Sequence, residues 1–187
     1  IALPKSGWKT LEDALKAGKE KGELTFGSST PLDKLLAAYL SKKSDTKLSP
    51  VPFNGGAEVV TNVMGGHVDM GYSSGAYYPH AKSGDLTVLA LLGENRLESL
   101  PDAPTLKELG YDVSSVNHIL YIAPKGLPDD VKEKLTKAFA TAAADKSVVD
   151  LMNQRSLNPV SLTGTDVDTA MKNQAASYGA LLKEVAE

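Results

Sequence analysis

The chain has 187 residues, of which 42% are hydrophobic and none is cysteine, and its formal net charge is −3. A chain with this charge and no basic stripe cannot neutralise many phosphates, so the composition argues against nucleic acid as a partner. The absence of cysteine excludes disulfides and thiolate catalysis. No apolar run approaches the roughly 20 residues of a membrane span. The length fits one large domain or two small lobes.

The first half of the chain predicts a helix followed by three strand–turn–helix units. Thr10 and Asp13 are spaced as a capping box, and the helix that they begin should end near Gly22. Three strand-like stretches, 24–26, 48–53 and 69–72, then each lead into a turn of small residues and a helix. This order predicts a parallel sheet with the helix N-termini gathered at one edge, where open α/β sheets bind ligands.

The second half predicts two more strands. Residues 86–92 form a continuous apolar run, which indicates a strand that is buried on both faces. A polar loop over 94–104 precedes a short helix over 105–110, which Thr105 caps. Residues 113–123 are rich in β-branched and apolar side chains, so we expect a strand that passes from one lobe to the other.

Three helices should complete the chain. They begin near Pro128, at Ser147 and after Thr165, and the second ends at Gln154. Helical spacing predicts a buried face for the first and the last of them. These faces consist of Val131, Leu135, Ala138, Phe139 and Ala142, and of Val167, Ala170, Met171, Tyr178, Leu181, Leu182 and Val185.

The turn Phe26-Gly27-Ser28-Ser29-Thr30-Pro31 is the strongest candidate for a binding site. Small hydroxyl residues at a helix start leave backbone N–H groups unpaired, and the helix dipole adds positive charge there. Such a turn binds an anion without arginine, and this chain has only Arg96 and Arg155. Asn54-Gly55-Gly56 before the next helix should allow similarly close approach of a ligand to the backbone.

One motif suggests catalysis instead. Gly71-Tyr72-Ser73-Ser74-Gly75 matches the G-x-S-x-G pattern of a serine esterase at a strand-to-helix turn. A hydrolase needs a downstream His, however, and the chain offers only His80 on the following helix and His118 in an apolar stretch. We therefore expect a turn that exposes backbone N–H groups, with no catalytic residue, and keep the esterase as the alternative.

The remaining polar residues predict no metal site and no cofactor. The spacing of His67, His80 and His118 is not that of a metal-ligand set. Asp69 precedes the third strand, and it should anchor a loop through backbone N–H groups or contact a ligand through water. Anchoring is the favoured role.

Several stretches together resemble the substrate-binding proteins of tripartite tricarboxylate transporters, the Bug family. The resemblance covers essentially the whole chain in order, and its most specific part is Pro101-Asp102-Ala103-Pro104-Thr105 with the following Glu108 and Gly110. The other stretches that carry it are 10–15, 24–28, 51–57, 65–69, 81–84 and 123–128. The resemblance implies an α/β, two-lobed periplasmic-binding-protein-like fold, with mainly parallel sheets flanked by helices, that closes on a small organic carboxylate.

The resemblance also implies the site residues and the division of the chain. Residues 7–116 would form a complete ligand-binding lobe, and 1–6 with 117–187 the C-terminal part of the other, the family's first lobe. That lobe would be incomplete, because family members carry a long segment before the position of Ile1, and a start without Met predicts a processed or truncated N-terminus. The residues expected to bind the ligand are Gly27, Ser28, Ser29, Thr30, Phe53, Asn54, Gly55, Gly56, Ala57, Asp69, Ser73 and Ser74.

Two positions depart from the family pattern. Phe53 stands where Tyr is common, and Ser73-Ser74 stands where larger polar side chains are common. The implied function is a periplasmic, non-enzymatic receptor that delivers a carboxylate to membrane transporter subunits, with self-association through the incomplete lobe as a further expectation. A ligand-sensing lobe of a regulator is a third hypothesis, disfavoured because no helix-turn-helix precedes it.

Overall fold

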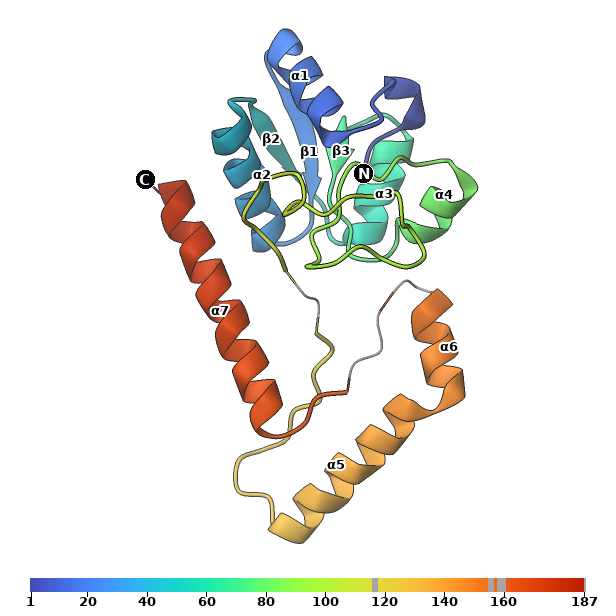
Figure 1. Ribbon diagram of the computed structural model, residues 1–187, viewed down its shortest axis with the longest axis vertical. Coiled ribbons are helices and arrows are strands. Elements are labelled where there is room, and N and C mark those ends of the chain that lie inside the picture. The colour runs from blue at the N-terminus through green and yellow to red at the C-terminus, as the bar shows by residue number, and fades with distance from the viewer. Residues whose placement is uncertain (116–117, 155–156, 158–160, 187) are drawn as a thin grey trace.

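The computed structural model describes residues 1–115, 118–154, 157 and 161–186. An α/β lobe occupies one end of the molecule, and an arm of three helices extends from it (Figure 1). The lobe contains a short 3-10 turn, Pro4–Ser6, followed by α1 (Leu11–Lys21), β1 (Leu24–Ser28), α2 (Pro31–Ser44), β2 (Leu48–Pro52), α3 (Gly56–Met64), β3 (Met70–Gly71) and α4 (Tyr78–Ser83). The arm contains α5 (Asp129–Ala144), α6 (Lys146–Gln154) and α7 (Thr165–Ala186).

Local sequence signals explain where α1 begins and ends. The Thr10 hydroxyl accepts a hydrogen bond from the Asp13 amide at 3.1 Å, and the Asp13 carboxylate accepts one from the Thr10 amide at 3.0 Å. This capping box is the one that the sequence predicts. Gly22 ends the helix with φ of 92°, a left-handed conformation that favours glycine.

The three strands form a parallel sheet in the order β2-β1-β3. The predicted strand–turn–helix units are therefore confirmed. The N-terminal residues join the same sheet in the antiparallel sense, since the Gly71 amide donates to the Ile1 carbonyl at 3.0 Å and the Ala2 and Thr87 backbones exchange hydrogen bonds at 3.0 and 2.9 Å. Residues 1–3, which the sequence analysis groups with the other lobe, thus pair with the lobe that contains β3.

Helices cover both faces of this sheet, and each face has its own apolar core. Leu11 and Leu15 of α1 pack with Leu36 and Leu40 of α2 in one cluster. The other cluster gathers Val59, Val60 and Val63 of α3 with Tyr77, Tyr78 and Leu86. Two glycines let α3 lie close to the sheet, because a Cβ atom on Gly27 or on Gly71 would stand 2.9 or 2.6 Å from Val59 Cγ1.

Both of the later predicted strands are wrong for the described residues. Leu86, Leu89, Leu91 and Leu92 are buried as expected, but residues 86–92 make only isolated bridges, from Thr87 to Ala2 and from Leu91 to Thr105. In the described parts of 113–123 there is no strand, and Ile122 is 91% exposed. Residues 116–117 of that prediction lie outside the described residues, as does the predicted domain boundary between them. A β-ladder needs a neighbouring strand, which neither stretch finds among the described residues.

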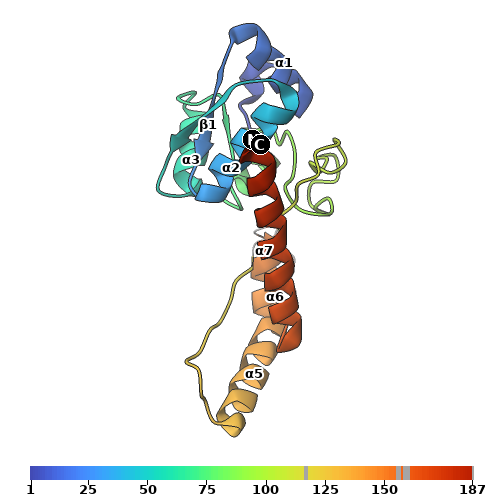
Figure 2. The same ribbon diagram turned by 90° about the vertical axis from the view of Figure 1, so that its left-hand side faces the viewer.

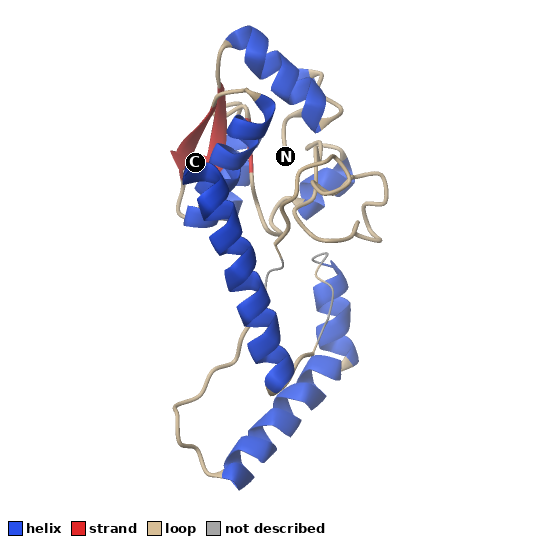
Figure 3. Ribbon diagram, turned by 60° about the vertical axis from the view of Figure 1, so that its left-hand side comes forward, coloured by secondary structure: helices blue, strands red, loops and turns tan. Residues whose placement is uncertain are grey.

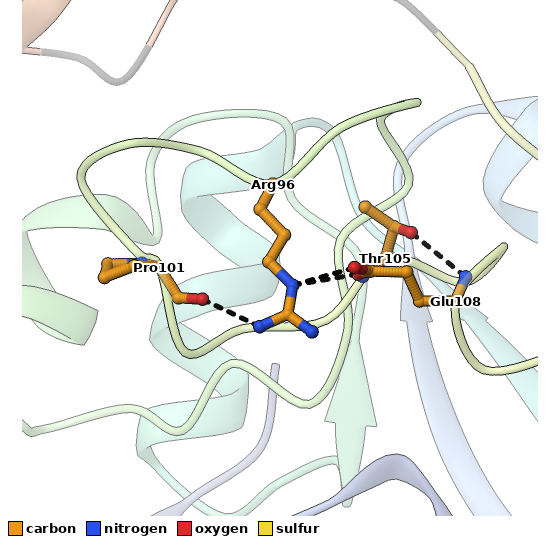
Figure 4. Close-up of polar contacts among 4 residues, drawn as sticks. All are labelled: Arg96, Pro101, Thr105 and Glu108. Atoms are coloured by element: carbon orange, nitrogen blue, oxygen red, sulfur yellow. Dashed lines mark hydrogen bonds and ion pairs between the residues drawn. The ribbon is translucent and has the colours of Figure 1, made fainter.

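The predicted short helix over 105–110 is a hydrogen-bonded turn. The Thr105 amide donates to Glu108 Oε2 at 2.7 Å, and the Glu108 amide donates to Thr105 Oγ1 at 3.1 Å. Arg96 Nε reaches both oxygens of the same carboxylate at 3.0 Å, while its Nη1 donates to the Pro101 carbonyl at 2.9 Å (Figure 4). These contacts fix the irregular stretch from 96 to 108 without regular secondary structure.

The three helices of the arm begin and end close to their predicted positions. In the described residues of the arm the regular structure is helical, and the strands lie in the lobe (Figure 3). The C-terminal end of α7 packs on α2, where Leu181 is buried and Lys43 Nζ lies 2.6 Å from the Glu184 carboxylate. The rest of the arm extends away from the lobe (Figure 2).

The predicted buried face of α5 is wrong, and that of α7 is confirmed only at its C-terminal end, at Leu181 and Val185. None of the 16 residues of α5, all of them described, is buried, and Leu135 and Phe139 are 39% and 43% exposed. In α7 only Leu181 is buried, and Leu182 is 58% exposed. The periodicity of these helices is amphipathic, but apart from the C-terminal end of α7, which packs on α2, and Phe139, whose ring stacks on Tyr121, their apolar sides are not covered by described residues. Among the described helices, none combines the length and the apolar character that a bilayer crossing requires.

Candidate functional site

Three turns meet at the carboxyl edge of the sheet. They follow β1, β2 and β3, whose ends face the arm (Figure 1). Backbone hydrogen bonds join these turns, since the Phe53 amide donates to the Ser28 carbonyl at 2.8 Å and the Tyr72 amide to the Gly27 carbonyl at 3.1 Å. The structure therefore brings together most of the residues that the sequence analysis selects.

The turn between β1 and α2 is not the open anion site that its sequence suggests. The Asp33 carboxylate lies there, and its Oδ2 accepts hydrogen bonds from the amides of Ser29 and Thr30 at 2.6 and 2.9 Å. Both hydroxyls also donate to it, that of Ser29 at 3.0 Å and that of Thr30 at 2.6 Å. Asp33 is 1% exposed. The expectation of free N–H groups at Ser29 and Thr30 is thus wrong, because an internal carboxylate occupies the N-terminus of α2.

Ser28 is also occupied inside the lobe. It is fully buried, and its hydroxyl donates to the Val51 carbonyl at 3.3 Å. Gly27 lies in β1 beneath α3, where the space for a side chain is taken by Val59 and by the ring of Phe53. These residues shape the sheet edge through their backbones.

The N-terminus of α3 has the free donors that α2 lacks. Gly55 is its N-cap and has no side chain to cap the helix. Within the part of the chain that the structure describes, no acceptor meets the amides of Gly55, Gly56 and Ala57. Glu58 Oε2 instead accepts from the Asn54 amide and side chain at 2.9 and 3.0 Å. Three N–H groups and the positive end of the helix dipole therefore remain available.

A second observation points to the same place. Ser73 is 6% exposed, and its Oγ has no hydrogen-bond partner among the described residues. A Cβ atom on Gly56 would stand 2.9 Å from this oxygen, so Ser73 Oγ lies directly at the N-terminus of α3. A buried hydroxyl without a partner costs about 1–3 kcal/mol, and an oxygen ligand bound to the α3 amides would satisfy it. Ser74, the next residue, is exposed.

Asp69 lies away from these donors, at the amino end of β1. Its Oδ2 accepts from the Thr25 amide and hydroxyl at 2.8 and 2.7 Å, and its Oδ1 lies 2.8 Å from Lys21 Nζ. Partial burial would raise the pKa of the Asp69 carboxyl, but the hydrogen bonds from Lys21 and Thr25 outweigh it and hold that pKa below its usual value. These contacts tie the loop before β3 to the start of β1.

Sequence reasoning missed two residues near the edge. Asp33 could have been found, because Thr30 and Asp33 have the same spacing as the capping box of Thr10 and Asp13. No sequence pattern around Tyr72 indicated a role for its side chain at the site. Burial and the nearby Asp33, Tyr77 and Tyr178 raise the pKa of the Tyr72 hydroxyl to about 12, so it stays protonated and can donate a hydrogen bond at neutral pH.

The geometry does not support catalysis or a metal. Ser73 Oγ has no hydrogen-bonded base in the described residues, so the nucleophile-elbow motif lacks its second member there. The described residues also contain no cluster of three or more His, Cys, Asp or Glu side chains suited to a metal ion. The free amides of α3 and the Ser73 hydroxyl, at the carboxyl edge of the sheet, can bind an anionic oxygen.

Comparisons with known proteins agree with this chemistry. The family model described as "Tripartite tricarboxylate transporter family receptor" matches residues 1–186. A protein of Cupriavidus necator, "UPF0065 protein in gbd 5'region", is 31% identical over 150 residues, which are 79% of this chain and 44% of the relative. The chain thus spans about half the length of the curated relatives it matches.

Solved structures show the same fold. A TctC solute-binding protein from Polaromonas, without ligand, is 26% identical with a TM-score of 0.69 over 95% of this chain and 62% of its own. An R. palustris protein solved with adipate is 18% identical with a TM-score of 0.82 over 96% of this chain and 62% of its own. They confirm the predicted fold class. The proteins matched are receptors and solute-binding proteins, not enzymes.

Proposed function

The chain belongs to the tripartite tricarboxylate transporter receptor family, and from this premise we propose that it binds a small organic carboxylate at the N-terminus of α3. The observation that carries the proposal is Ser73 Oγ, a buried hydroxyl that has no partner in the described residues and lies beside Gly56. One carboxylate oxygen accepts from Ser73, and the amides of Gly56 and Ala57 donate to the same carboxylate.

The chain has only two arginines, so several guanidinium groups cannot bind the carboxylate together, and backbone N–H donors take that role. A hydrogen bond to a charged group contributes about 1.5–3 kcal/mol, more than a neutral one. Donors fixed on α3 and on the turn after β3 need no rearrangement to meet the anion, which reduces the entropic cost of binding. The buried Asp33 carboxylate already accepts from the amides at the N-terminus of α2. These amides are therefore not available to a second carboxylate of a ligand.

The fold neighbour with adipate supports a dicarboxylate as the first ligand to test. We further propose that the receptor acts in the periplasm and delivers its ligand to membrane transporter subunits, as the family name implies. Self-association through the arm is also part of the proposal. It is supported by the exposed apolar side chains of Ile119, Tyr121, Ile122 and Phe139.

Isothermal titration calorimetry with adipate tests the site. Ser73→Ala should weaken binding at least several-fold, because it removes one donor from a charged acceptor. Ser83→Ala is the control, since Ser83 is exposed at the end of α4 and its hydroxyl bonds the His80 carbonyl and Asp85, and the affinity of this variant should equal that of the wild type. Equal affinity of the Ser73→Ala variant and the control would contradict the site.

The same Ser73→Ala variant separates the esterase alternative. Purified protein incubated with a simple chromogenic ester should release no product above the uncatalysed rate. Turnover that disappears in the Ser73→Ala variant would overturn the receptor proposal in favour of covalent catalysis.

A further inference from the structure

A chain of side-chain hydrogen bonds lies where the polypeptide leaves and rejoins the lobe. Tyr178 OH lies 2.6 Å from Ser115 Oγ and accepts from Gln174 Nε2 at 2.6 Å. Gln174 Oε1 lies 2.9 Å from His118 Nδ1. The four residues, which we call the relay, are Ser115, Tyr178, Gln174 and His118, and all are half-buried.

The amide of Gln174 sets the direction of its own two bonds in the relay. Its Nε2 donates to the Tyr178 oxygen, and in the remaining bond either the Tyr178 or the Ser115 hydroxyl can donate to the other. Its Oε1 can only accept, so His118 Nδ1 carries the proton of the third bond. Each bond of the relay therefore pairs a donor with an acceptor.

The relay joins the core of the lobe to a part of the chain that has no buried residue. On the lobe side, the Ser115 amide donates to the carbonyl of Leu92, a core residue, at 2.9 Å. Beyond the relay towards the C-terminus, α7 is held by Leu181 and by the contacts of Glu184 with Lys42 and Lys43 at 2.6 Å. On the other side of it, α7 has no buried residue from Thr165 to Tyr178, and the arm extends away from the lobe (Figure 2).

A cavity lies beside this junction. It has a volume of about 330 Å³ and is lined by residues of α2, of the 92–115 stretch and of α7, among them Leu36, Tyr39, Ser115, Tyr178 and Leu181. Closely packed interiors resist displacement. Open space next to Tyr178 means that packing alone does not hold the ring in place, and the hydrogen bonds carry that task.

We propose that the relay is a latch that sets the orientation of the arm relative to the lobe. Tyr178 and Gln174 are positioning residues: they couple the outgoing segment at Ser115 and His118 to the returning helix α7. With the latch made, both connections move as one body, and the arm faces the sheet edge at one angle. With the latch broken, the two connections move separately and the arm samples several angles. The proposal concerns motion alone and holds whatever ligand the sheet edge binds.

Distance measurement between lobe and arm tests the latch. Because the chain has no cysteine, spin labels at Lys16→Cys in α1 and Lys137→Cys in α5, both exposed positions, report one distance by electron–electron dipolar spectroscopy. The parent should give one narrow distribution. Tyr178→Phe, which keeps the ring and removes the hydroxyl, should give a broader distribution or a second maximum.

Matched variants distinguish a latch from a general loss of stability. Ser177→Ala, which removes only a hydroxyl bonded within α7 at 3.1 Å, should leave the distribution narrow. His118→Leu should broaden it, whereas His118→Asn, which keeps an N–H donor, should restore the narrow form. If Tyr178→Phe fails to fold by circular dichroism, the two His118 variants decide. The proposal would be overturned if the distance distributions of Tyr178→Phe and His118→Leu both stayed narrow. If Tyr178→Phe is unfolded, a narrow distribution in His118→Leu alone would overturn it.

Discussion

Replacement of Asp33 tests whether an internal carboxylate organises the sheet edge. In Asp33→Ala the amides of Ser29 and Thr30 lose their acceptor, at 2.6 and 2.9 Å in the native chain. Water reaches the exposed Thr30, so the unpaired Ser29 amide carries the cost of about 1–3 kcal/mol, and we expect the free energy of unfolding to fall by about 2 kcal/mol. Asp33→Asn can turn its oxygen to the same two amides, so it loses only the charge and should cost about 1 kcal/mol.

Urea unfolding measures these changes. The single tryptophan, Trp8, packs against the core of the lobe and reports its unfolding by fluorescence. The midpoint should fall in the order wild type, Asp33→Asn, Asp33→Ala, with an unchanged slope. Asp13→Ala is the matched control, because Asp13 occupies the same capping-box position on α1 but is exposed. If the Asp13 and Asp33 alanine variants lower the midpoint equally, burial of the carboxylate contributes nothing and the reasoning is refuted.

Three further predictions concern the site, the loop before β3 and the arm. Gly56→Ala places a methyl group 2.9 Å from Ser73 Oγ and should weaken adipate binding in calorimetry, whereas Gly75→Ala meets nothing within 4 Å and should bind as the wild type does. The lowered pKa of Asp69 means that its ionised form stabilises the fold above the usual Asp value of 3.8 and that this stabilisation is lost as the pH falls through the folded-state pKa. Acid unfolding of Asp69→Asn should therefore show a smaller loss of stability below pH 3.8 than the wild type, and parallel curves would contradict the anchoring role. Ile122 is 91% exposed, so Ile122→Ser should shift sedimentation towards monomer if copies associate through the arm, and an unchanged, monomeric wild type would exclude that contact.

The parts of the fold that the sequence predicts well are those that depend on neighbouring residues along the chain. Thr10 with Asp13, and Gly22, determine α1 through bonds within one or two turns. The turn after β2 likewise leads into α3 because Gly55 and Gly56 leave the backbone open there. Convergence of the three turns follows from the handedness of consecutive parallel units, which is nearly invariant.

The parts that the sequence predicts poorly depend on distant partners. Residues 86–92 are apolar enough for a strand, yet pairing is limited to Thr87 and Leu91. Phe139 has the right spacing for a buried helix face, but its ring stacks on Tyr121, which is itself 73% exposed, so Phe139 stays 43% exposed. At the site, Thr30 correctly marked the start of α2, but only the structure separates Ser29, which a carboxylate already engages, from Ser73, which has no partner among the described residues.

The close approach of α3 to the sheet has a kinetic consequence. Gly27 and Gly71 bring Val59 against the strands, so α3 cannot shift along or away from the sheet without opening a void in the core. The donors at its N-terminus are accordingly held before a ligand arrives. Encounter with the lobe should then be a collision with a rigid receptor face, and any slow step in ligand exchange belongs to the arm. In stopped-flow binding, a phase whose rate does not depend on ligand concentration would therefore reflect motion of the arm. The donors at the N-terminus of α3 would not move in that phase.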